Sequence, residues 1–286
     1  SGDQEGTIKY FESTLANISV IPDAHTNAVR GLSFSPSDSK FVSGSDDGTV
    51  GIWDWEGRRK EAVMTEHGWD VRCVAWHPFY SLVVSGSKDN TVKLWDPREA
   101  RCLSTLYGHK NTVLAVAWNP MNGNWLATGA RDHLIKLYDV RAMKEWLTLR
   151  GHDKEVCSLA WHPHQEALLA SGGFNGALAY WMCGHLEGGG SLTPHTYIDN
   201  AHGYSVNTLA WHGVGYVLAS ASNDGIVKFW GREVPGSNLV QERSDYVDPL
   251  VVRRGPRLPE PEEEAAAAGG GRGGGGGGGC PGRQTR

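Results

Sequence analysis

Residues 67–78 read HGWDVRCVAWHP, and related strings return at 151–163 (GHDKEVCSLAWHP) and 201–213 (AHGYSVNTLAWHG). Each copy places a histidine a few residues before an alternating apolar run that ends in Ala-Trp. Such a run is typical of a half-buried β-strand, and the His-Pro or His-Gly after it is typical of a turn. The stretch is therefore one unit of a repeat, and the repeat decides the fold.

A second string follows each unit and ends just after an aromatic residue: GTVGIWD ends at Asp54, TVKLWD at Asp96 and LIKLYD at Asp139. Two more copies end at Met182 and Gly231, and the five aromatic residues recur every 42 to 49 residues. Each repeat shares four positions: a histidine, a Ser or Thr, an Asp or Asn four residues later, and the aromatic residue six residues after that. From the first repeat to the fifth, these positions are His25, Ser43, Asp47 and Trp53; His67, Ser85, Asp89 and Trp95; His109, Thr128, Asp132 and Tyr138; His152, Ser171, Asn175 and Trp181; and His202, Ser220, Asp224 and Trp230.

A period of about 40–45 residues with these marks is the signature of a β-propeller blade. On these residues the chain resembles the WD40 family, and the resemblance covers residues 6–231. It implies an all-β propeller with four antiparallel strands per blade, in which the four shared positions form a buried, hydrogen-bonded structural tetrad. His77 and His162 precede Pro and are expected to be turn residues. We expect no metal site, because the histidines follow the blade spacing and no Cys or carboxylate cluster joins them.

The repeats predict the domain organisation. We expect an incomplete seven-bladed ring of about five and a half blades within residues 1–240, with an unpaired edge near residues 6–22, because GTIKYF aligns with GTVGIW and puts Phe11 in the place of Trp53. An insertion at 183–200 is expected to be a loop. The tail at 241–286, rich in Pro, Glu, Ala and Gly, is expected to be disordered. The predicted blades are 25–65, 66–107, 108–150, 151–200 and 201–231.

Composition narrows the function classes. The 286 residues carry a net charge of −5, which does not favour a dedicated duplex-binding protein. Five widely spaced cysteines, an odd number, favour a reduced intracellular protein. There is no apolar run near 18 residues, so no membrane partner is expected. Outside the repeat stands no nucleophile–base pair, carboxylate pair or phosphate loop, so we expect no enzyme, no catalytic residue and no cofactor.

The WD40 resemblance places two positions per repeat on one face of the ring: two residues after the histidine, and one before the turn Asp. Aromatic and basic side chains gather there, as in a hot spot for a protein or an unpaired nucleotide. For Trp69 the alternative is packing against a neighbouring loop. Asp46, at the same level, is expected to face solvent. The candidate partner-binding residues are Trp69, Lys88, Asn111, Arg131, Lys154, Phe174 and Tyr204.

Several strings resemble one subfamily more closely, among them HGWDVRCVAWHP, VVSGSKDNTVKLWD and NGNWLATGARDHLIKLYDVRAMKE. They are similar to the WD40 subunits of the cleavage and polyadenylation specificity factor, a family that includes the plant flowering-time regulator of RNA 3′-end processing and yeast polyadenylation factor subunit 2. The resemblance implies a nuclear, non-catalytic scaffold of the pre-mRNA 3′-end cleavage and polyadenylation complex. It would contribute to polyadenylation-signal recognition through the factor's other subunits. The family's RNA-contacting segments lie upstream of the repeats present here, so weak or no pre-mRNA binding is expected for this chain alone.

Two short motifs suggest an alternative function. WDPR (95–98) and YDVR (138–141) resemble the motif by which WD40 proteins dock onto cullin-RING ubiquitin ligases. The alternative function is therefore a WD40 substrate receptor of a cullin-RING ubiquitin ligase. Arginine at this place is also common in propellers as a cap of the turn.

Overall fold

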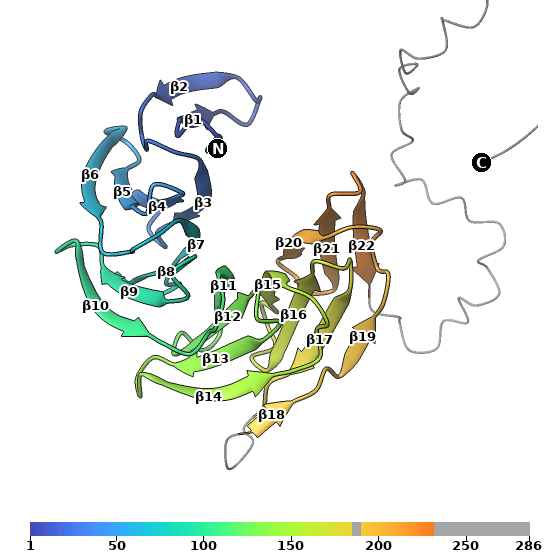
Figure 1. Cartoon of the computed structure of the whole chain (residues 1–286). Helices are drawn as coiled ribbons and strands as arrows, with labels where there is room; N and C mark the ends of the chain where they lie inside the picture. The colour runs from blue at the N-terminus through green and yellow to red at the C-terminus, as the bar shows by residue number, and fades with distance from the viewer. Residues whose placement is uncertain (185–189, 232–286) are drawn as a thin grey trace, which may run out of the picture. The chain divides into compact units, whose positions relative to one another are not determined.

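The computed structural model describes residues 1–184 and 190–231 of the chain, and in these residues every regular element is a β-strand (Figure 1). The all-β fold class is confirmed. No helix long and apolar enough to cross a membrane occurs in these ranges. The predicted disorder of 241–286 lies outside the described residues.

Five successive sheets form the blades, each an antiparallel meander in chain order. Blade 1 is β3 (Val29–Phe34), β4 (Lys40–Ser45), β5 (Val50–Asp54) and β6 (Arg59–Met64); blade 2 is β7 (Val71–Trp76), β8 (Val83–Ser87), β9 (Val92–Asp96) and β10 (Arg101–Leu106); blade 3 is β11 (Val113–Trp118), β12 (Trp125–Ala130), β13 (Ile135–Asp139) and β14 (Lys144–Leu149); blade 4 is β15 (Val156–Trp161), β16 (Leu168–Gly173), β17 (Leu178–Met182) and β19 (Thr196–Ile198); and blade 5 is β20 (Val206–Trp211), β21 (Val217–Ser222) and β22 (Val227–Gly231). Within the unit Ser1–Glu233 the first strands lie innermost along a curved row of sheets (Figure 1).

Neighbouring blades pack through their first two strands. The residue that opens each first strand is a fully buried valine in blades 2 to 5, such as Val113. It lies against a glycine of the preceding blade: a Cβ added to Gly86 would come within 2.6 Å of Val113 Cγ1. A larger residue at Gly86 would therefore push blades 2 and 3 apart, which explains the recurrent Ser-Gly of the second strands.

A tryptophan near the end of the first strand joins the same blades by a hydrogen bond. The indole N–H of Trp118 donates to the carbonyl of Ala75 in blade 2, at 3.3 Å. Trp161 and Trp211 repeat this bond to the preceding blade, at 3.1 and 3.2 Å. These residues are the Trp of the repeated Ala-Trp string, so the string builds the contact between blades.

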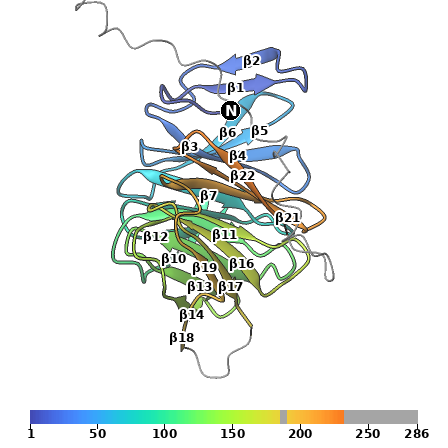
Figure 2. The ribbon, with the colours of Figure 1, turned by 90° about the vertical axis from the view of Figure 1, so that its right-hand side faces the viewer.

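The insertion at 183–200 is not only a loop, and this prediction was wrong. β19 is the fourth strand of blade 4, and β18 (Gly190–Leu192) pairs in parallel with β14, the outer strand of blade 3 (Figure 2). The backbone N–H of Arg150 also donates to the Leu192 carbonyl, at 2.9 Å. The outer edge of β14 offers unpaired backbone groups to any extended segment. Since that pairing uses the backbone, side-chain periodicity gave no sign of it.

The N-terminal residues form a smaller sheet of β1 (Ile8–Phe11) and β2 (Asn17–Ile21). Gly2 makes an isolated bridge to Ile8 on the other side of β1. Phe11 does not share the environment of Trp53: it is exposed, whereas Trp53 is buried. Tyr10, the residue before it, is buried against Phe41 of blade 1.

Candidate partner-binding site

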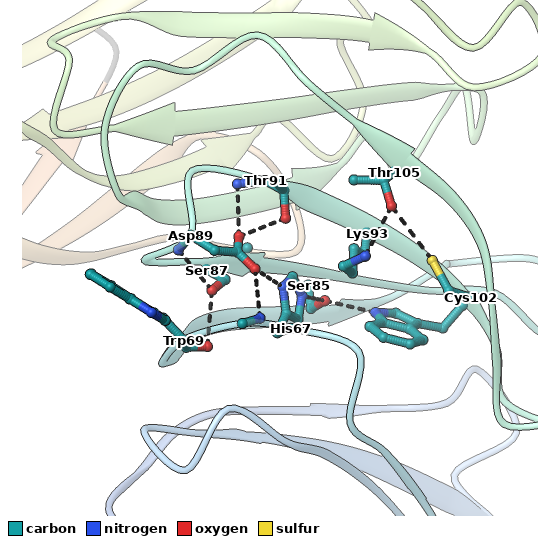
Figure 3. Close-up of polar contacts among 12 residues, drawn as sticks. His67, Trp69, Ser85, Ser87, Asp89, Thr91, Lys93, Cys102 and Thr105 are labelled. Atoms are coloured by element: carbon teal, nitrogen blue, oxygen red, sulfur yellow. Dashed lines mark hydrogen bonds and ion pairs between the residues drawn. The ribbon is translucent and has the colours of Figure 1, made fainter.

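The tetrad of blade 2 forms a connected chain of hydrogen bonds (Figure 3). Trp95 Nε1 lies 2.7 Å from Ser85 Oγ, and Ser85 Oγ lies 2.6 Å from His67 Nε2. His67 Nδ1 in turn lies 2.8 Å from Asp89 Oδ2. The indole can only donate, so the serine hydroxyl donates to His67 Nε2 and the histidine donates from Nδ1 to the carboxylate. Each group has a partner, which makes such a buried network stabilising.

Asp89 is the end point of this chain and also orders the loop around it. It accepts hydrogen bonds from the backbone of Gly68 at 3.2 Å and from the backbone and hydroxyl of Thr91 at 2.9 and 2.6 Å. Burial works against its ionisation, but the bonds from His67 and Thr91 outweigh burial and hold the pKa of Asp89 below its usual range. The carboxylate is therefore charged at neutral pH and fixes both the histidine and the loop.

Blades 1 and 5 contain the same set of bonds. His25 Nδ1 lies 3.0 Å from Asp47, and His202 Nδ1 lies 3.0 Å from Asp224. The serines bond the histidine and tryptophan as in blade 2. The Asp47 and Asp224 carboxyls also have lowered pKa values, because hydrogen bonds to ionised oxygen offset their desolvation.

Two members do not join their tetrads as expected. In blade 3, His109 bonds Asp132 and Thr128, at 2.9 and 2.7 Å. The buried Tyr138 hydroxyl, however, has no hydrogen-bond partner within the described part of the chain. A phenol carries its O–H at the tip of the ring, not at the place of an indole N–H, so it does not reach Thr128.

In blade 4 the missing bond is the one between the histidine and Asn175, which stands in the place of the acid. His152 Nε2 lies 2.6 Å from Ser171 Oγ, and Trp181 donates to the same oxygen at 2.7 Å. Asn175 instead contacts Tyr197 and its own turn, and His152 Nδ1 finds no partner among the described residues. Burial without a carboxylate at hydrogen-bond distance lowers the pKa of His152 to about 4.

The loops and turns that the tetrad carboxylates order form one surface of the blades, which we call the tetrad face. It comprises the seven residues predicted to meet a partner, and all seven side chains are exposed: Trp69, Lys88, Asn111, Arg131, Lys154, Phe174 and Tyr204. In each blade the two halves of this face are joined by a backbone bond between turn and loop. Lys88 N donates to Asp70 O at 2.9 Å, and Phe174 N to Glu155 O at 2.8 Å.

Trp69 is the largest apolar group on this face. It is 63% exposed, and its indole points away from the tetrad (Figure 3). Its backbone carbonyl accepts a hydrogen bond from Ser87 Oγ at 3.1 Å, while Lys88 Nζ lies 5.5 Å from the ring centroid. Trp69 also lines a hollow together with Asp46, Asp47 and Gly48 of the neighbouring blade 1 turn, so packing against that loop stays the alternative for this residue. Phe174 and Tyr204 are similarly open, at 56% and 67% exposure.

Asp46 does not simply face solvent, and this prediction was wrong. Its carboxylate lies 2.5 Å from Arg30 Nη2 and 3.1 Å from Arg72 Nη1. The two arginines stand at the same place on the first strands of blades 1 and 2, so they converge on the turn that carries Asp46. The sequence signal was the shared Val-Arg that opens both strands.

The described residues hold no group of three or more His, Cys, Asp or Glu side chains placed to bind a metal ion. The tetrad serines are fully or almost fully buried and already hydrogen-bonded, so they are not available as nucleophiles. What the site offers is a surface of open aromatic and basic groups held in place by a rigid network.

Comparison with known proteins fits this architecture. The family model described as "IFT122 first beta-propeller" matches residues 1–248. The chain belongs to this family of WD40 β-propellers. A WD40 fold also accounts for the likeness to a chain of the crystal structure of the mitotic checkpoint complex, with a TM-score of 0.73 and 26% identity over 82% of this chain and 70% of that one.

Curated relatives of this WD40 propeller are more similar over a shorter stretch. Polyadenylation factor subunit 2 of Aspergillus fumigatus is 48% identical over 62 residues, and that of Candida albicans is 42% identical over 64. Each match spans 22% of this chain and 12% of the relative. The resemblance to WD40 subunits of polyadenylation factors is therefore confirmed at the level of sequence, over part of the propeller.

Proposed function

We propose that this WD40 propeller is a non-catalytic scaffold of the nuclear machinery that cleaves and polyadenylates pre-mRNA. In this role it binds other subunits of the cleavage and polyadenylation specificity factor and meets pre-mRNA within the assembled complex. The observation that carries the proposal is the 48% identity to a polyadenylation factor subunit over 62 residues, a stretch that spans 22% of this chain.

The tetrad face is the surface we assign to this binding. Large aromatic anchors that are exposed in the free chain and held by a rigid backbone are typical of interface hot spots. Trp69 meets both conditions, and Lys88 beside it adds a cation whose charge is shared with Asp70 at 3.4 Å. A pre-ordered loop loses little entropy on binding, which favours affinity.

The test is a co-purification from nuclear extract with the tagged full chain. We expect the polyadenylation subunits to co-purify with wild type. With Trp69→Ala, the amount of these subunits recovered should fall at least tenfold. Tyr216→Ala, an equally exposed aromatic on the turn between β20 and β21, is the matched control and should retain them. Because Trp69 is exposed, its replacement should leave the melting temperature nearly unchanged.

The cullin-ligase alternative is tested in the same experiment with Arg98→Ala plus Arg141→Ala. The backbone N–H groups of both arginines are capped by the preceding aspartates, at 2.9 and 2.8 Å. Loss of a ligase adaptor from the double variant, with no polyadenylation subunit recovered from wild type, would replace our proposal by that alternative.

A further inference from the structure

A cavity lies at the ends of the strands opposite to the tetrad face, between blades 1 and 2. Its volume is about 290 Å³. The turns from β3 to β4, from β7 to β8 and from β9 to β10 form its wall. Its lining residues include Ser37, Lys40, Phe79, Tyr80, Ser81 and Arg98. We call it the turn cavity.

Two open aromatic residues stand at the turn cavity. Phe79 and Tyr80 are 57% and 66% exposed, although each belongs to a residue type that usually buries its ring. Both are held by the buried His77: their backbone N–H groups donate to His77 Nδ1, each at 3.0 Å. His77 Nε2 is fixed in turn by the Gly123 carbonyl of blade 3, at 2.8 Å. These bonds fix the backbone of the turn, and the imidazole of His77 also contacts both rings, with centroids 6.0 Å from Phe79 and 4.9 Å from Tyr80.

Two basic residues, Lys40 and Arg98, line the cavity. Lys40 is neutralised by Glu61, at 2.5 Å. The guanidinium of Arg98 makes no hydrogen bond or ion pair to the residues that the structure describes, whereas the backbone N–H of Arg98 donates to Asp96. Ser37 and Ser81 also line the cavity and add two hydroxyl groups to its wall. The lining of the cavity thus includes one free guanidinium and two open aromatic rings.

We propose that the turn cavity binds a linear peptide segment of a partner protein, with one carboxylate on Arg98 and one apolar or aromatic side chain against Phe79 and Tyr80. A guanidinium matches a carboxylate in a bidentate pair. A single-stranded nucleic acid fits less well, because its phosphates require a row of cations along the groove. One unpaired arginine on a chain of net charge −5 supplies no such row. The proposal does not depend on the polyadenylation assignment.

The probe is a displayed library of random 12-residue peptides, selected on the full chain and depleted on the Arg98→Ala variant. We expect the recovered peptides to share an acidic residue next to an apolar one. Binding of the consensus peptide should fall at least tenfold with Arg98→Ala and with Phe79→Ala. It should not change with the matched controls Arg141→Ala and Tyr216→Ala, and all four variants should melt near the wild-type temperature because the replaced side chains are exposed.

Three outcomes would overturn the proposal. The first is a consensus that contains no acidic residue, and the second is recovery of no binding peptide at all. The third is displacement of the consensus peptide by an equal concentration of an oligouridine, because that result assigns the cavity to nucleic acid. A co-purification result for the tetrad face leaves this test unaffected, so the two proposals fail separately.

Discussion

Asp89 shows how much one side chain does in a blade. It accepts hydrogen bonds from His67, from Gly68 and from both donors of Thr91. It therefore couples the tetrad to the loop that presents Trp69. Removing it leaves buried donors without an acceptor, which costs more than the bond itself contributes.

We expect Asp89→Ala to lower the free energy of unfolding by roughly 1–3 kcal/mol. Urea denaturation of the full chain measures this change. Asp153→Ala is the control, because Asp153 is exposed, and it should change stability by less than about 0.5 kcal/mol. Equal effects for the two variants would show that the tetrad acid has no special role.

His152 provides a second prediction, which depends on pH. Its folded pKa of about 4 lies below the usual value near 6.5, so the unfolded chain binds more protons between these values. Stability is therefore unaffected above about pH 6.5 and falls as the pH drops toward 4. At pH 5 this histidine alone should cost roughly 2 kcal/mol.

Asn175→Asp should reduce that loss, because a carboxylate in place of the amide gives His152 Nδ1 an acceptor and raises its pKa. Urea denaturation at pH 7 and pH 5 gives the comparison. We expect the variant to be more stable than wild type at pH 7 by about 1 kcal/mol and to lose less on acidification. An unchanged difference between the two pH values would contradict the assigned cause.

Spacing alone predicted which residues occupy the tetrad positions, because a repeat fixes equivalent places in equivalent blades. It could not predict which members form their bonds. Tyr138 and Asn175 match the pattern by residue class, yet one carries its polar atom too far out and the other faces Tyr197. Such failures depend on distances of about an ångström, which a pattern of residue types does not contain.

At the scale of elements, the turns after the first strands connect neighbouring blades. His77 and His162 were predicted as turn residues, but each also bonds a carbonyl of another blade, Gly123 at 2.8 Å and Gly215 at 2.9 Å. Asn119 does the same in blade 3, with Oδ1 accepting from its own turn and Nδ2 donating to Glu166 O at 2.7 Å. The recurrent His-Pro and Asn-Pro therefore carry information about contacts between blades.

We expect His77→Ala to lower the free energy of unfolding by roughly 1–3 kcal/mol, because two turn N–H groups and one carbonyl lose their partner. His77→Asn gives blade 2 the residue that makes the corresponding bonds in blade 3, Asn119, and should recover at least half of the lost stability. Thermal denaturation of both variants checks the expectation. If the asparagine variant is as unstable as the alanine variant, the hydrogen bonds are not the cause.

Alternation of apolar residues indicates the first strands of the blades, such as β7 and β11. β18 did not follow, since the segment is Gly-rich and pairs with an edge that belongs to another repeat. Local patterns report the face that a segment buries; they do not report which distant backbone it meets.

At the scale of the whole molecule, fold and family were predictable because five repeats agree, whereas the identity of the partners depends on surface residues that the repeat does not constrain. The same surface gives a prediction on RNA. We expect residues 1–286 to bind an AAUAAA-containing RNA no better than a scrambled one, because the net charge of −5 offers few cations for phosphates.

Fluorescence anisotropy with the two labelled RNAs, at low and at physiological salt, measures this. Any binding should depend only weakly on salt, since few counterions are released. A sequence-specific complex at submicromolar concentration would show that this chain reads bases without its partners.

The indole bonds between blades have a spectroscopic consequence. Trp118, Trp161 and Trp211 each stand at a different boundary, with the N–H on a carbonyl of the preceding blade. When two neighbouring blades separate, that bond breaks and one indole becomes exposed to water. The emission maximum of that tryptophan then moves to longer wavelength, while the emission maxima of the other two do not change. Variants that retain one of the three as the only changing fluorophore would let the order in which the boundaries open be followed in real time, with no dye attached.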